Sequence, residues 1–128
     1  MSRGTWRAPN LVLVKGNDAG LVRERSTSAL AQVPHPTAPI KALAELAGVG
    51  PATASAVLSA AEPAVYPFLD ELVAEQIIGL GKVAFTLGYY AKYAEALRAR
   101  SAQIGSDWTA GMVEQALWAS VGGKAGVR

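Results

Sequence analysis

A tight break lies between two alanine-rich apolar runs, where Gly48-Val49-Gly50-Pro51 interrupts what would otherwise be one long helical pattern. Gly48 can adopt the left-handed backbone conformation that ends a helix, which other residues rarely adopt. Pro51 suits the first position of the next helix, where its missing N–H costs nothing. The stretch therefore predicts two helices joined by a turn of about three residues.

Most of the remaining chain spaces its apolar residues as helices do. The predicted helices cover residues 18–30, 39–47, 51–61, 69–80 and 86–104, and a last one begins after Asp107 or Thr109. In residues 11–16, LVLVKG, a strand competes with a short helix. The 128 residues, 51% of them apolar, suffice for one modest core. We expect an all-α fold, a small single-domain helical bundle over residues 1–121, with a flexible C-terminal tail at 122–128.

Composition excludes several kinds of site and distributes charge unevenly. The chain has no cysteine, which rules out disulfides and thiolate metal sites, and its apolar stretches are too short to span a bilayer. His35, the single histidine, has no other metal-ligating side chain near it in a proline-rich loop. Residues 1–41 hold six basic and two acidic residues, a net charge of +4, whereas residues 42–128 hold six and eight, a net charge of −2.

The predicted turn offers backbone donors to an anion. A helix N-terminus leaves its first N–H groups without intrahelical acceptors, and here these belong to Ala52 and Thr53. Glycines at 48 and 50 place no side chain in front of an approaching oxyanion. Gly48, Gly50, Ala52 and Thr53 are therefore the predicted phosphate-binding residues. Such contacts reach only the backbone of a nucleic acid, so binding should depend on salt and not on base sequence.

The pattern L43-x-x-L46-x-G48-V49-G50-x-x-T53-A54-x-x-V57-L58 resembles the helix-hairpin-helix element of DNA-binding and DNA-repair proteins, including the DNA glycosylase superfamily. The motif would occupy residues 40–61. The resemblance implies an extended apolar segment leading to a catalytic aspartate, and Asp70 lies at the spacing of the endonuclease III-like branch. It also implies a monovalent cation, potassium or sodium, held by the backbone carbonyls of Ala44, Leu46 and Val49, with no other cofactor required.

The chain departs from this family in ways that bear on activity. Bifunctional glycosylases carry a lysine nucleophile two residues after the last hairpin glycine, where this chain has Ala52, so no Schiff base can form there. Asp70 is followed by Glu71-Leu72 instead of the usual Thr-His pair. Asp70 and Glu71 also fit a plainer interpretation, as acidic residues at the start of the next helix.

These observations favour a nucleic-acid-binding module, related to the glycosylases but without their chemistry, over an enzyme. DNA is the expected partner ahead of RNA, without a membrane, in an intracellular compartment that contains DNA. Two other functions stay open. One is a monofunctional glycosylase that uses Asp70, and the other is a helical module that binds a protein or belongs to a ribonucleoprotein.

Overall fold

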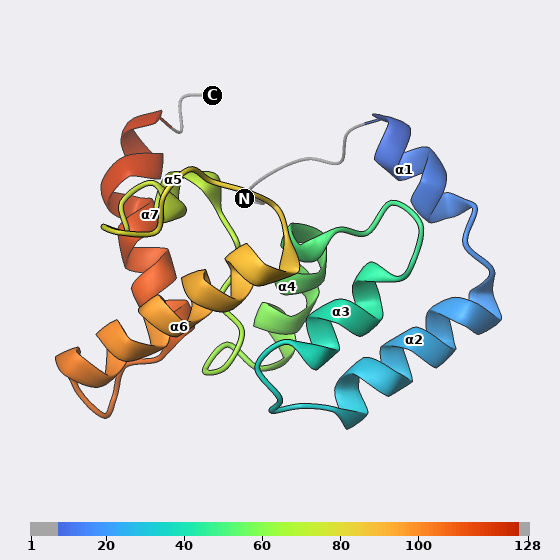
Figure 1. Ribbon diagram of the computed structural model, residues 1–128, viewed down its shortest axis with the longest axis horizontal. Helices are drawn as coiled ribbons and strands as arrows, with labels where there is room; N and C mark the ends of the chain where they lie inside the picture. Colours follow the sequence, from blue (N-terminus) through green and yellow to red (C-terminus); the bar gives the residue numbers. More distant parts are fainter. Residues whose placement is uncertain (1–7, 126–128) are drawn as a thin grey trace.

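The computed structural model describes residues 8–125, and over that range its regular secondary structure consists of helices, without a strand (Figure 1). The all-α prediction is confirmed. The helices are α1 (Ala8–Lys15), α2 (Ala19–Ala31), α3 (Ala38–Ala44), α4 (Pro51–Ala61), α5 (Glu71–Ala74), α6 (Leu87–Ile104) and α7 (Ala110–Ala125).

Two packed groups of helices make up the fold. α2, α3 and α4 pack in succession, while α7 packs against both α6 and α5. α4 also contacts α6, which joins the two groups (Figure 1). α1 lies at the edge of the molecule, beside the loop that joins α3 to α4. In the described chain, no helix is both long and apolar enough to cross a membrane.

The helix starts follow local chemistry that can be identified in the sequence. Pro9 stands in the first turn of α1, so the helix, and not the competing strand, forms at residues 11–15. The Asp18 carboxylate accepts a hydrogen bond from the Leu21 backbone N–H at 3.1 Å and caps α2. The hydroxyl oxygens of Thr86 and Thr109 likewise accept from backbone N–H groups three residues later, at the starts of α6 and α7.

Three buried tyrosines hold the extended segment 66–70 against the core. Tyr66 donates to the His35 carbonyl at 2.5 Å, Tyr90 to the Pro67 carbonyl at 3.0 Å and Tyr93 to the Phe68 carbonyl at 2.6 Å. Burial raises the pKa of Tyr90 and of Tyr93 above the ordinary phenol value, because the phenolate would lose its hydration. These hydroxyls therefore remain protonated donors.

The predicted helix over residues 69–80 is wrong. Only Glu71–Ala74 is helical, and turns follow it. Gly79 and Gly81 both have left-handed backbones, with φ of 86° and 82°, which a continuous right-handed helix does not contain. The left-handed Gly79 excludes a helix that continues to residue 80, and the turns at residues 75–78 already end it after Ala74.

The helical part of the chain extends further toward the C-terminus than expected. α7 runs through Ala125, beyond the expected end of the domain at residue 121. The flexibility of the tail at 122–128 stays a prediction, and residues 126–128 lie outside the described chain.

The start of α3 is capped by a histidine. Thr37, the residue before the helix, makes no side-chain cap. Instead the Nδ1 atom of His35 accepts hydrogen bonds from the backbone N–H groups of Thr37 at 3.2 Å and Ala38 at 2.9 Å. An imidazole nitrogen accepts hydrogen bonds through its lone pair, so Nδ1 takes the place of a side-chain oxygen in this cap.

Removing this cap should destabilise the fold. We expect His35→Ala to lower the free energy of unfolding by about 1 kcal/mol, as loss of a side-chain cap commonly does. Chemical denaturation measures the difference. Gln32→Ala is the control, because among the described residues the side-chain amide of Gln32 bonds to Ser28 alone, one turn earlier. Equal stability of the two variants would contradict the capping role.

Candidate nucleic-acid interface at the α3–α4 turn

The candidate interface is the turn formed by residues 45–50 between α3 and α4, called the α3–α4 turn below. Gly48 has a φ of 77°, the left-handed conformation that the sequence predicts for it. Gly50 is extended, with φ −99° and ψ −178°, and Pro51 begins α4 directly after it. The geometry thus needs glycine at 48, whereas the backbone at 50 would accept other residues.

All four predicted phosphate-binding residues lie in this turn or in the first turn of α4. Within the described residues, the backbone N–H groups of Gly48, Gly50, Ala52 and Thr53 have no hydrogen-bond acceptor. The first backbone hydrogen bond of α4 is made by Ala54, whose N–H donates to the Gly50 carbonyl at 2.9 Å. The donors at the start of α4 are therefore available to an anion, and the helix dipole favours negative charge there.

The two glycines differ in what surrounds them. A Cβ added at Gly50 would have no atom of the described residues within 4 Å, so none of them covers this side of the turn. A Cβ added at Gly48 would lie 2.5 Å from the Asn10 carbonyl oxygen and 2.8 Å from Val14. Gly48 is thus packed against α1, and Gly50 is the glycine that an oxyanion can approach.

A contact that the sequence did not predict fastens α1 to this turn. The side-chain amide of Asn17 donates to the Ala47 carbonyl at 2.9 Å, and its oxygen accepts from the Ala47 N–H at 3.1 Å. The same amide donates to the Val14 carbonyl at 3.2 Å, at the end of α1. Because Asn17 and Ala47 are distant in sequence, no local pattern could have paired them.

An ion pair reduces negative charge beside the turn. Glu45 is the first residue after α3, and its carboxylate lies 2.6 Å from Nη1 of Arg25 on α2. Unpaired, that carboxylate would repel a phosphate at the start of α4. Arg25 also lies 3.5 Å from the Glu24 carboxylate, so it offsets one of two negative charges here, and the partly exposed pair adds little to stability.

The carbonyls predicted to hold a cation lie in the same segment. Within the described chain, those of Ala44 and Val49 accept no hydrogen bond, and that of Leu46 accepts one from the Val49 N–H at 3.2 Å. A carbonyl oxygen has two lone pairs, so all three retain capacity for an ion. No group of three or more His, Cys, Asp or Glu side chains in the described residues is placed to bind a metal.

Asp70, the candidate catalytic residue, is 9% exposed and caps α5. Its carboxylate accepts from the backbone N–H groups of Leu72 at 2.8 Å and Val73 at 3.4 Å. Its own N–H is within 3.4 Å of the Tyr93 hydroxyl. This is the placement expected of an acidic residue that starts a helix.

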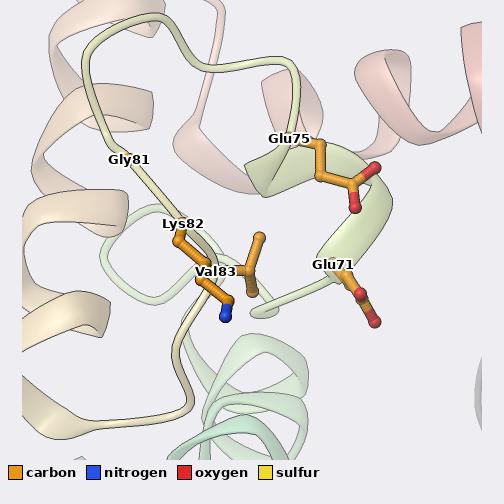
Figure 2. Close-up of a pocket in the computed structure, with 5 residues that line it drawn as sticks. All are labelled: Glu71, Glu75, Gly81, Lys82 and Val83. Atoms are coloured by element: carbon orange, nitrogen blue, oxygen red, sulfur yellow. The ribbon is translucent and has the colours of Figure 1, made fainter.

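A shallow pocket of about 370 Å³ lies beside α5, and Asp70 is not part of its wall. It is lined by Glu71 and Glu75 from α5 and by Gly81, Lys82 and Val83 from the following loop. Figure 2 shows both carboxylates turned away from Lys82, so the charges do not converge on one point. The pocket therefore lacks the grouped polar atoms of a binding site.

Comparison with protein-family models, with curated protein sequences and with solved structures finds no match for this chain. The resemblance to helix-hairpin-helix proteins thus depends on the motif residues alone, and it stays a prediction.

Proposed function

We propose that the protein binds nucleic acid, DNA in preference to RNA, through phosphate contacts at the α3–α4 turn and without reading base sequence. The observation that carries the proposal is that the backbone N–H groups of Gly50, Ala52 and Thr53 have no acceptor among the described residues, together with the open space at Gly50. The preference for DNA comes from the resemblance of this turn to the helix-hairpin-helix motif.

The chemistry of these donors favours a phosphate over other ligands. Backbone N–H groups at a helix start recognise an anion by position and charge, without contact to a base edge. The Arg25–Glu45 ion pair limits repulsion on one side of the turn. Lys41 on α3 and Lys15 at the end of α1 are exposed and add positive charge in the same half of the molecule.

The surroundings of Asp70 support binding without catalysis. A catalytic carboxylate has to reach a sugar or a water molecule, whereas this one is buried and accepts two backbone hydrogen bonds. The pocket beside α5 does not open onto it. A monofunctional glycosylase is the second candidate, because Asp70 lies at the spacing expected from the family.

A salt series separates DNA binding from a ribonucleoprotein role and from protein binding. Phosphate contacts release counterions, so affinity for duplex DNA should fall as salt rises. The series should be measured on duplex DNA, single-stranded DNA and structured RNA by fluorescence anisotropy. Tightest binding to structured RNA would favour a ribonucleoprotein role. Absence of nucleic-acid binding, together with salt-insensitive binding to a protein, would favour a protein-interaction module.

Gly50→Val should remove binding while the fold is kept. The space at this position admits a side chain, which would then stand in front of the free N–H groups. Because hydrogen bonds to a charged group contribute about 1.5–3 kcal/mol each, affinity for duplex DNA should fall at least about tenfold. Circular dichroism checks the fold. Ala60→Val, a matched change on the exposed side of α4, should bind duplex DNA like the parent. Unchanged affinity of Gly50→Val for duplex DNA would refute the interface.

Exchanging the monovalent cation tests the proposed ion. An ion held by the carbonyls of Ala44, Leu46 and Val49 would bridge the turn and the phosphate. Replacing potassium by tetramethylammonium at equal ionic strength should then weaken binding of duplex DNA by the parent protein. Titrations in the two salts measure the effect. Equal affinity in both would show that no such ion takes part.

Asp70→Asn distinguishes a binding module from a glycosylase. Asparagine keeps an oxygen to accept the Leu72 N–H, so the cap of α5 and the fold should survive. For a binding module we expect unchanged affinity for duplex DNA and no base release from damaged duplexes by either protein. Base release by the parent that disappears in Asp70→Asn would establish the glycosylase instead.

A further inference from the structure

We propose that α1 and Asn17 form a clasp that holds the α3–α4 turn in its left-handed geometry, and that release of this clasp weakens nucleic-acid binding. The effect on binding rests on the proposed function, whereas the clasp itself follows from contacts in the described chain. Asn17 is therefore assigned as a positioning residue, because its side chain bonds to the turn and not to a ligand.

The side-chain amide of Asn17 both donates a hydrogen bond to the backbone of Ala47 and accepts one from it. It donates to the Ala47 carbonyl at 2.9 Å and accepts from the Ala47 N–H at 3.1 Å. In the described chain, Asn17 provides the only acceptor for that N–H. The backbone of the residue before Gly48 is thus fixed by one side chain from another part of the protein.

α1 completes the clasp by packing on Gly48. The Asn10 carbonyl oxygen, the Val14 side chain and Cβ of Leu13 all lie within 3.0 Å of the place where a Cβ of residue 48 would be. The third bond of the Asn17 amide, to the Val14 carbonyl, joins the end of α1 to the same contact. One amide therefore fixes the position of α1 and the backbone of the turn together.

Apart from the clasp, α1 makes few packing contacts, so the clasp determines its position. None of the extensive helix–helix contacts among the described elements involves α1. Its side chains Val12 and Leu13 are 70% and 50% exposed. Figure 1 shows α1 beside the α3–α4 loop and apart from the packed helices. Loss of a few hydrogen bonds at Asn17 should consequently release it.

The geometry indicates that α1 supports the proposed interface and does not block it. α1 covers the Gly48 side of the turn, while a Cβ added at Gly50 would have no atom of the described part of the chain within 4 Å. The N–H groups of Ala52 and Thr53, which have no acceptor among the described residues, belong to the first turn of α4 after Gly50. Preorganised donors bind an anion without a cost of ordering them, so a loosened turn should bind more weakly.

Hydrogen exchange on Asn17→Ala tests the clasp without any ligand. The Ala47 amide should exchange about tenfold faster, because its acceptor is gone. The Ala54 amide, bonded to the Gly50 carbonyl, should keep its rate. Asn17→Asp retains an acceptor oxygen and should protect Ala47 while losing the donated bonds. Gln32→Ala, which removes an exposed amide elsewhere, should change neither rate. An unchanged Ala47 rate, or equal acceleration at Ala47 and Ala54, would overturn the clasp.

Duplex DNA binding by the same variants completes the experiment. Asn17→Ala should bind duplex DNA several-fold more weakly than the parent, because its turn is no longer held in the binding geometry. Gln32→Ala should bind like the parent. Faster exchange at Ala47 with unchanged affinity would overturn the effect on binding. If the parent itself did not bind duplex DNA, both the proposed function and the effect of the clasp on binding would be overturned. Hydrogen exchange at Ala47 would still show whether the clasp exists.

Discussion

The left-handed backbone at Gly48 is the constraint on which the arrangement of this half of the molecule depends. It turns the chain away from the direction of α3 and lets α4 begin at Pro51 a few residues later. The absence of a side chain at the same residue lets α1 approach to contact distance. A larger residue at 48 would meet both a strained backbone and the Asn10 carbonyl oxygen. One glycine therefore sets the direction of α4 and the place of α1.

A second constraint holds the other half, where the extended segment 66–70 passes through the core. Its backbone cannot satisfy its polar groups within a helix or sheet, so side chains from neighbouring elements do so. The Tyr90 and Tyr93 hydroxyls serve two carbonyls, and Ser55 of α4 accepts from the Leu69 N–H at 2.8 Å. Since these bonds come from α4 and α6, the segment connects the two packed groups of helices.

Features that are settled within a few residues could be predicted from the sequence, whereas those that depend on distant partners could not. The left-handed Gly48 and the helix start at Pro51 are local, and both predictions are confirmed. The helix predicted over 69–80 is wrong, because the chain turns after Ala74 and the left-handed Gly79 excludes a helix that continues to residue 80. The bonds from Asn17 to the turn join residues about thirty positions apart, which no periodicity reveals. From the sequence, Asp70 fits both a catalytic role and a place at the start of a helix. Its hydrogen bonds show it as a helix cap, while a catalytic role stays a prediction.

The charge of the chain limits how tightly the proposed interface can bind. Each phosphate neutralised contributes a slope of about 0.9 in the salt dependence of duplex binding, and tight nonspecific binders make several such contacts. A single helix start, with two exposed lysines in the same half of the molecule, can engage only one or two phosphates, and the net charge of the whole chain is +2. The affinity of this interface alone for duplex DNA should therefore be modest. Strong association would require a second contact that acts together with the first, because linked sites raise the effective local concentration of each other.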